Sequence, residues 1–124
     1  MLSKNNRVNR SLIEEVFKKG KFINSPNLTL KFINISQKSL FSKISFIVPR
    51  VVSKKAVVRN LIRRRGYSVL REHINKLPID FVGVFIFGKR SSSVFGGKKN
   101  REYNPIQNLK AEIETILNKL HNSY

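Results

Sequence analysis

The sequence contains no cysteine, no long apolar run and few acidic residues, and each absence excludes a class of protein or site. Without cysteine there can be no disulfide bond and no thiolate metal site. No apolar run approaches the ~20 residues that a membrane-spanning helix needs. The first ten residues are polar and basic, unlike a secretory signal. We therefore expect a cytoplasmic protein.

The seven acidic residues and two histidines do not suggest a protein active site. Glu14 and Glu15 are adjacent and point apart on a helix. Asp80 is the only candidate for a buried carboxylate, and a lone carboxylate cannot form a two-metal nuclease site. His73 and His121 lack metal-ligand spacing, and we expect them to be exposed or half-buried on helices. The sequence therefore predicts no catalytic residue, no protein-bound metal or cofactor and no small-molecule substrate.

Positive charge dominates the composition. Lysine and arginine number 25 against seven acids, which gives a net charge of +18. A compact chain with this charge repels itself unless a polyanion is nearby, so nucleic acid is the expected partner. A generically basic protein is the alternative. An anionic membrane is not expected, because its binding requires an amphipathic helix whose apolar face is free to insert.

The length of 124 residues and the hydrophobic content of 40% predict one domain spanning residues 1–124. Hydrophobic periodicity predicts helices at about 11–19, 53–75 and 105–121, and strands at about 27–35, 42–48 and 79–88. There is room for an extra short strand near Phe22, and residues 89–104 are expected to form a basic loop. The order α-β-β-α-β-α predicts an α+β fold, a two-layer α/β sandwich with helices largely on one face of the sheet.

Local signals indicate where the helices begin. Ser11 and Glu14 have the spacing of a capping box, and Ser53 is expected to be the N-cap of the second helix. Asn104 followed by Pro105 is typical of a helix start. The apolar run from 79 to 88 predicts a central strand covered at least in part on both faces.

The second predicted helix and the segment before it are unusually basic. No acid separates their eight cations, which are Arg50, Lys54, Lys55, Arg59, Arg63, Arg64, Arg65 and Arg71. Lysines at a helix N-terminus oppose the helix dipole, and a bound phosphate would relieve that repulsion. A solvated charged face without function is the alternative.

These charges separate by angle around the helix. Val58, Ile62 and Val69 form an apolar stripe that is expected to pack on the sheet, and Arg65 lies near that stripe and is expected to snorkel. Guanidinium groups bind phosphate bidentately, and amides bind phosphate or ribose hydroxyls. Tyr67 has two open interpretations, stacking on a base or packing. The predicted RNA-binding residues are Arg50, Lys54, Lys55, Arg59, Asn60, Arg63, Arg64, Tyr67 and Arg71.

Two stretches resemble the bacterial ribonuclease P protein family. The first runs from Val48 to Arg64 and contains Arg59-Asn60 followed by Ile62 and two arginines, which is similar to the family's Arg-Asn-x-Ile-basic-Arg core. The second is Val-Phe-Lys-Lys-Gly at residues 16–20, which resembles the close of the family's first helix. The order of elements also agrees, so the resemblance covers nearly the whole chain.

The resemblance implies a division of labour. In this family a large RNA carries out the hydrolysis that removes the 5′ leader of precursor tRNA, with magnesium expected at the RNA. The protein is a cofactor that binds this RNA through its basic helix and holds the leader between the sheet and the first helix. The family fold contains a mixed sheet with an unusual left-handed β-α-β crossover.

By position, the resemblance assigns contacts with the catalytic RNA to Arg59, Asn60, Arg63 and Arg64, with Lys54 and Lys55 close by. The leader would contact Phe17, Lys31 (where some members have Tyr) and the additional aromatic candidates Phe22 and Phe32. Two rival functions remain open. One is a ribosomal or chaperone-like binder of structured RNA, and the other is a nuclease that needs no RNA partner.

Overall fold

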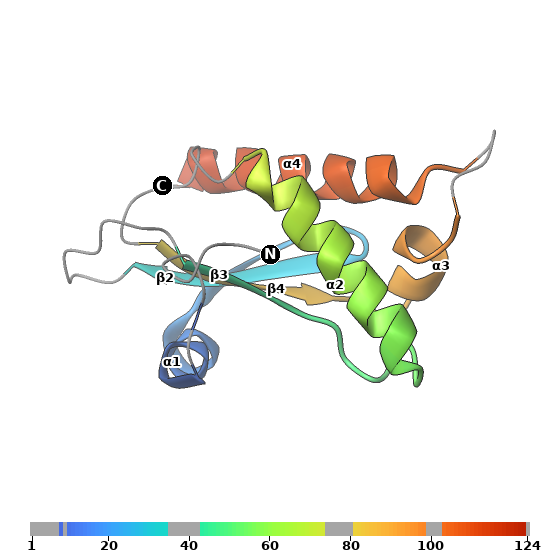
Figure 1. Cartoon of the computed structure of the whole chain (residues 1–124). Coiled ribbons are helices and arrows are strands. Elements are labelled where there is room, and N and C mark those ends of the chain that lie inside the picture. Colours follow the sequence, from blue (N-terminus) through green and yellow to red (C-terminus); the bar gives the residue numbers. More distant parts are fainter. Residues whose placement is uncertain (1–7, 9, 35–42, 74–80, 99–102, 124) are drawn as a thin grey trace.

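The computed structural model describes residue 8 and residues 10–34, 43–73, 81–98 and 103–123 (Figure 1). Along this described part of the chain, the elements are α1 (Arg10–Lys19), β1 (Lys21–Asn24), β2 (Leu28–Asn34), β3 (Lys43–Ile47), α2 (Ala56–Arg71), β4 (Phe81–Phe87), α3 (Ser91–Phe95) and α4 (Pro105–Ser123). The predicted α+β class and order are confirmed, with β1 as the extra short strand and α3 as an addition.

The four strands form one mixed sheet in the order β1-β2-β4-β3. β1 pairs with β2 and β2 pairs with β4 in antiparallel fashion, whereas β3 and β4 are parallel. Since α2 connects β3 to β4, these three elements form the predicted β-α-β unit. This unit places the basic helix directly over the sheet.

β4 is a central strand that is covered on both faces, as its apolar run predicted. Phe81, Phe85 and Phe87 belong to the main core. Val82 and Val84 point to the other face, where they are buried with Val16 of α1. The alternation of side chains along a strand therefore accounts for a run that is apolar at nearly every position.

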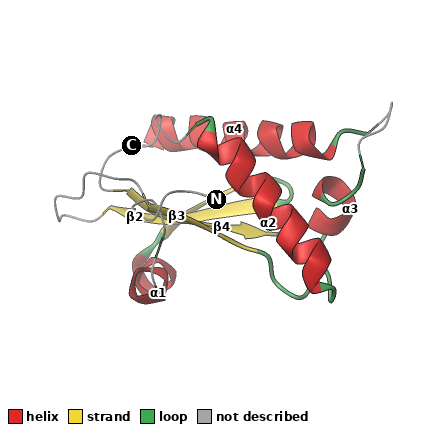
Figure 2. Cartoon of the chain, in the orientation of Figure 1, coloured by secondary structure: helices red, strands yellow, loops and turns green. Residues whose placement is uncertain are grey.

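The helices are divided between the two faces of the sheet. α2, α3 and α4 cover the face that carries the main core, and α1 is the one helix of the described residues on the other face (Figure 2). We call that second face the α1 side. Since α1 is only ten residues long, it covers part of the α1 side, and half-exposed residues of β2, β3 and β4 lie beside it.

The short helix α3 was not predicted, because the segment 89–104 was expected to be a loop. Its five residues are too few for a periodic signal, and long-range contacts stabilise it instead. Phe95 is fully buried, with its ring centroid 5.7 Å from that of Phe87. Its last carbonyl groups accept hydrogen bonds from the side chains of Arg65, Tyr103 and Asn108.

The predicted helix starts were partly wrong. α1 begins at Arg10, one residue before Ser11, and α2 begins at Ala56 with Lys55 as its N-cap residue. Ser53 therefore does not cap α2, although its Oγ accepts a hydrogen bond from the Lys55 N–H at 3.2 Å. The start of α4 is confirmed, since Oδ1 of Asn104 accepts a hydrogen bond from the N–H of Gln107 at 3.1 Å. The helix predicted to reach residue 75 ends at Arg71.

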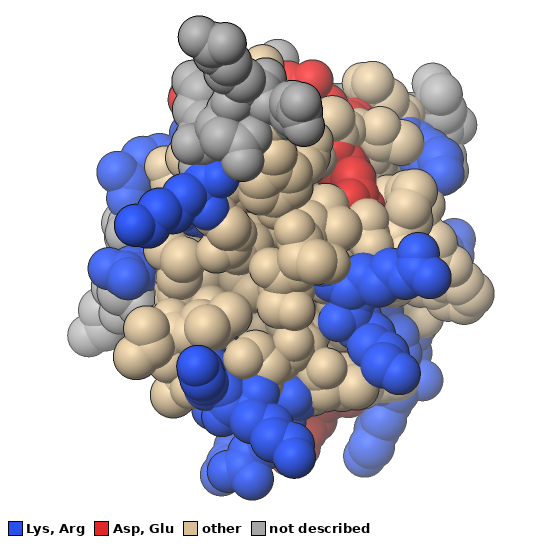
Figure 3. All heavy atoms as spheres, turned by 90° about the vertical axis from the view of Figure 1, so that its right-hand side faces the viewer, with Lys and Arg blue, Asp and Glu red and all other residues tan. Residues whose placement is uncertain are grey.

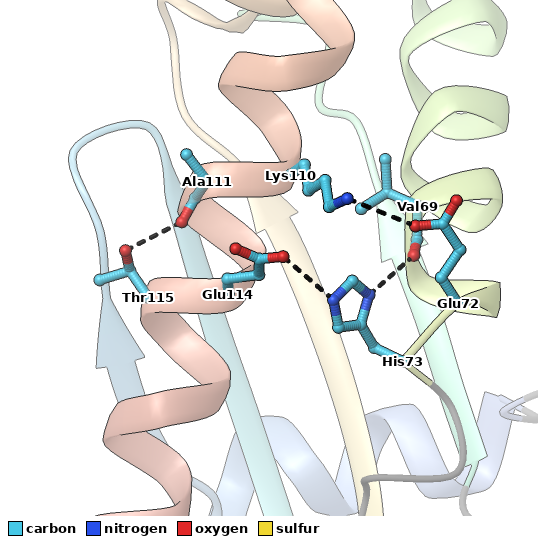
Figure 4. A network of polar contacts seen from close by, with 7 residues as sticks. All are labelled: Val69, Glu72, His73, Lys110, Ala111, Glu114 and Thr115. Atoms are coloured by element: carbon cyan, nitrogen blue, oxygen red, sulfur yellow. Dashed lines mark hydrogen bonds and ion pairs between the residues drawn. The ribbon is translucent and has the colours of Figure 1, made fainter.

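His73 is buried, and the expectation of an exposed or half-buried histidine is wrong for this residue. Its Nδ1 lies 3.1 Å from the carbonyl oxygen of Val69, and its Nε2 lies 3.3 Å from Oε1 of Glu114 (Figure 4). Beside this contact, Nζ of Lys110 lies 3.8 Å from Oε2 of Glu72. The C-terminal end of α2 is thus fastened to α4 by polar contacts.

Other predictions about chemistry concern residues that the structure does not describe. Asp80 and the side chain of His121 lie outside the described residues. Among the residues that are described, no group of three or more His, Asp or Glu side chains could hold a metal ion. No helix in the same set is both long enough and apolar enough to cross a membrane.

Candidate nucleic-acid interface

Helix α2 turns an apolar stripe to the sheet and a charged flank to the outside. Ile62, Gly66 and Val69 are buried, whereas Asn60 and Arg64 are exposed. Gly66 allows the close approach, because a Cβ at this position would lie 2.9 Å from two ring carbons of Phe46. The predicted separation of charge by angle is therefore confirmed on the folded helix.

The segment between β3 and α2 brings further cations to the same flank. Arg50, Lys54 and Lys55 are exposed there. Nη1 of Arg59 donates a hydrogen bond at 2.8 Å to the carbonyl oxygen of Ser53, which ties this segment to the first turn of the helix. No acidic residue lies in that turn. We use the name basic flank for Arg50, Lys54, Lys55, Arg59, Asn60, Arg63, Arg64 and Arg71.

The surface view shows cations distributed around one face of the protein (Figure 3). On the side where α3 lies, Lys and Arg side chains project around the margin of a mostly uncharged centre (Figure 3). Such an arrangement offers phosphate contacts at separate points around one face. Of the predicted basic residues, five are exposed to solvent, where a polyanion can reach them, and Arg59 and Arg63 are half-buried.

Tyr67 and Arg65 have structural partners. The Tyr67 ring meets the Phe46 ring edge-on with centroids 4.9 Å apart, and its hydroxyl accepts a hydrogen bond from the Phe46 N–H at 3.3 Å. These contacts favour the packing interpretation of Tyr67. Nη1 of Arg65 donates to the carbonyl oxygens of Phe95 and Gly97 at 2.6 and 2.8 Å. Arg65 therefore holds α3 against α2, in place of the predicted snorkelling.

A second candidate surface lies on the α1 side. Phe17 on α1 is 44% exposed and Phe22 on β1 is 63% exposed, which is unusual for aromatic side chains. Nζ of Lys31 lies 5.0 Å from the centroid of the Phe17 ring. Phe22 is the cross-strand partner of Lys31, so the two side chains share one face of the sheet. We call Phe17, Phe22 and Lys31 the aromatic cluster.

Phe32 does not belong to this cluster, and its prediction as a leader-binding residue is wrong. It is only 7% exposed, and its ring stacks on that of Phe81 at 5.6 Å in the main core. Successive side chains along a strand point to opposite faces of the sheet, so Lys31 and Phe32 lie on different faces. Phe32 therefore stabilises the core and cannot reach a ligand on the α1 side.

Sequence reasoning missed two sets of residues. Thr29, Ser45 and Ile86 share the α1 side with Lys31 and are half-exposed. Strand alternation could have found them. Glu112 of α4 binds the turn between β1 and β2 through Ser25 and Asn27, and no local pattern could have indicated a contact over 85 residues of sequence.

Comparison with known proteins agrees with this geometry. The family model Ribonuclease P matches residues 2–121. The RNase P protein from Thermotoga maritima is 22% identical and superposes with a TM-score of 0.74, covering 91% of this chain and 96% of that chain. A Staphylococcus aureus RNase P protein mutant with defective mRNA degradation activity is 16% identical, with a TM-score of 0.75 and coverage of 95% and 90%.

No curated protein gives a significant match. The two solved structures establish the fold, and the family model covers almost every residue that the structure describes. The chain therefore belongs to the ribonuclease P protein family, whose members act in tRNA processing with an RNA partner.

Proposed function

We propose that this chain is the protein subunit of ribonuclease P, which binds the catalytic RNA and assists removal of the 5′ leader from precursor tRNA. The observation that carries the proposal is the basic flank of α2, which turns cations outward while the opposite stripe of the helix packs on the sheet. In this proposal the RNA subunit, with its magnesium ions, performs the hydrolysis in the cytoplasm. The protein supplies binding and orientation.

The basic flank is proposed to contact the catalytic RNA. Arg63 and Arg64 are adjacent cations on the outer part of α2, and Asn60 is exposed one turn earlier. Each guanidinium group can donate two parallel hydrogen bonds to a phosphate, and the Asn60 amide can bond phosphate or ribose. Lys54 and Lys55 extend the positive surface to the helix N-terminus, where the dipole also favours an anion.

The aromatic cluster is proposed to hold the leader of precursor tRNA. A single strand without a required sequence is bound by cations that contact its phosphates and by rings on which bases stack. Phe17 and Phe22 present exposed rings, and Lys31 supplies the cation between them. Their neighbours on the α1 side, Thr29 and Ser45, offer hydroxyl groups. The basic flank and the cluster therefore give one protein two contacts with RNA.

Reconstitution tests the proposal. The purified protein is added to a ribonuclease P RNA at low magnesium concentration, and cleavage of precursor tRNA is measured with and without the protein. We expect a large gain in cleavage at the 5′ end of the mature tRNA. Binding without any gain would instead favour a chaperone-like RNA binder, and cleavage by the protein alone would favour a nuclease.

A further inference from the structure

We infer that Glu112 of α4 is a positioning residue for the leader: it fixes the β1–β2 turn and thereby places Phe22. This inference rests on the proposed leader-binding role of the aromatic cluster. Glu112 is on the opposite face of the sheet from α1 (Figure 1), so it acts on the leader only through β1.

The carboxylate of Glu112 accepts three hydrogen bonds from the turn. Oε1 accepts from Oγ of Ser25 at 2.6 Å and from the Asn27 N–H at 2.8 Å, and Oε2 accepts from Nδ2 of Asn27 at 3.0 Å. Hydrogen bonds to an ionised acceptor are stronger than neutral ones. Just before the turn, Nζ of Lys119 donates a hydrogen bond at 3.0 Å to the carbonyl oxygen of Asn24, the last residue of β1. Helix α4 thus holds this bend of the chain at three residues, Asn24, Ser25 and Asn27.

β1 depends on these contacts because burial does little to hold it. It is a four-residue edge strand that pairs only with β2. Ile23 is its one side chain packed against the main core, and the other three are exposed. A short strand with so little apolar burial can shift unless polar contacts fix its end. Glu112 supplies three of those contacts, and Ser25, Thr29 and Lys119 supply others.

A shift of β1 would reach the proposed leader site directly. Phe22 follows Lys21 at the start of β1 and stands opposite Lys31, whose Nζ lies over the Phe17 ring. The far end of the turn is anchored separately, since the Gly88 N–H donates to the carbonyl oxygen of Asn27 at 2.8 Å. The β1 end keeps the bond from the Ser25 N–H to the Leu28 carbonyl oxygen at 2.8 Å, so loss of the Glu112 contacts removes the hold of α4 on the turn and leaves this pairing in place. Because β1 is the outer strand and β2 pairs on both sides, we expect Phe22 to shift more than Lys31.

The test uses the full-length variant Glu112→Gln with the reconstituted RNA. The glutamine side chain has the same shape as glutamate, but its NH₂ group would face the Nδ2 donor of Asn27, so the hydrogen bond between them is lost. We expect the preference for precursor over mature tRNA to fall by about fivefold, the effect of about one lost hydrogen bond. Affinity for the ribonuclease P RNA and its salt dependence should not change. Glu114→Gln is the matched control, because it makes the same change on the same helix away from the turn.

A second substitution offers rescue. In Asn27→Asp alone, two carboxylates would face each other, so leader preference should also fall. In the double variant Glu112→Gln, Asn27→Asp, the amide of residue 112 can donate to the new carboxylate, and leader preference should recover. A loss in the double variant that is smaller than the sum of the two single losses supports a direct contact between residues 27 and 112.

The possible results distinguish failure of this inference from failure of the proposed function. If the unaltered protein shows no leader-dependent preference, the proposed function fails. If that preference exists and Glu112→Gln retains it, the inference is overturned. It is equally overturned if Glu112→Gln lowers leader preference and affinity for the ribonuclease P RNA alike, because that result indicates a general structural role.

Discussion

Substitution of Gly66 by alanine tests how closely α2 packs on the sheet. An added Cβ would lie 2.9 Å from Cδ1 and Cε1 of Phe46, a distance that requires one group to move. The Phe46 ring has little freedom, because its centroid lies 4.9 Å from those of both Phe85 and Tyr67 and 5.8 Å from that of Phe87. Helix propensity alone would make Gly66→Ala stabilising.

The magnitudes decide between these effects. Replacing glycine by alanine in a helix gains about 1 kcal/mol of stability. Overpacking a rigid core costs about 1–3 kcal/mol. We therefore expect a net loss of about 1 kcal/mol, which would lower the Tm by about 4 °C in a domain of this size.

Urea unfolding followed by circular dichroism measures this change, with the slope m expected to stay constant. Ser68→Ala is the matched control, since Ser68 is exposed on the same helix and should gain a few tenths of a kcal/mol, about 0.5 at most. A Gly66→Ala protein as stable as the unaltered one would refute the close contact between α2 and Phe46.

Four further substitutions test other parts of the structure. Arg63→Ala should weaken binding to the ribonuclease P RNA and lower the salt slope by about one unit, and an unchanged slope in a filter-binding titration would mean that Arg63 touches no phosphate. Phe17→Ala should reduce leader preference with little effect on stability. Phe32→Ala should instead cost about 3–5 kcal/mol of stability in urea unfolding. Equal stability losses would contradict the exposed position of Phe17 and the buried position of Phe32. His73→Ala should cost about 2 kcal/mol in the same assay, because it removes a buried ring together with its polar contacts to the Val69 carbonyl oxygen and Glu114. The exposed Thr115→Ala serves as its control, and a similar loss in both would contradict the role of His73.

Much of the fold follows from periodicity in the sequence. Ile62 and Val69 recur at helical spacing, and both are buried under α2. Phe85 and Val84 alternate along β4, and each reaches a different core. These elements were predictable because a hydrophobic stripe on a helix, or alternating hydrophobic residues on a strand, indicates which face packs against the core.

Features that depend on particular hydrogen bonds, with near or distant residues, were not predictable in this way. Ser53 has the residue type of an N-cap, but the Val52 N–H donates to the carbonyl oxygen of Pro49 at 3.0 Å, and the resulting turn delays the helix start to Ala56. The side chain of Arg65 supports α3 from 30 residues away. Local sequence carries no record of either contact.

The residues of the candidate site were likewise predictable only in part. The exposure of Asn60 and Arg64 agrees with the predicted separation of charged and apolar residues by angle on α2, whereas the contacts of Arg65 with α3 were not predicted. Lys31 and Phe32 were both assigned to the leader on the strength of family resemblance, although adjacent strand residues cannot share a face. Strand parity alone would have removed Phe32. An assignment made from family resemblance should therefore be checked against the face of the strand on which the residue lies.

The connection from β3 to α2 explains how the two candidate surfaces come to lie on one protein. β3 is an edge strand, and Ser45 and Ile47 on it face the α1 side. The chain leaves β3, passes through Arg50 and Lys54, and enters α2 on the opposite face of the sheet. The cations of this segment therefore lie where the chain passes from β3 to α2, whereas Phe22 and Lys31 of the aromatic cluster lie on β1 and β2, separated from β3 by β4. In the proposed function, the same edge strand can serve the leader on one face while the helix that follows it binds the catalytic RNA on the other.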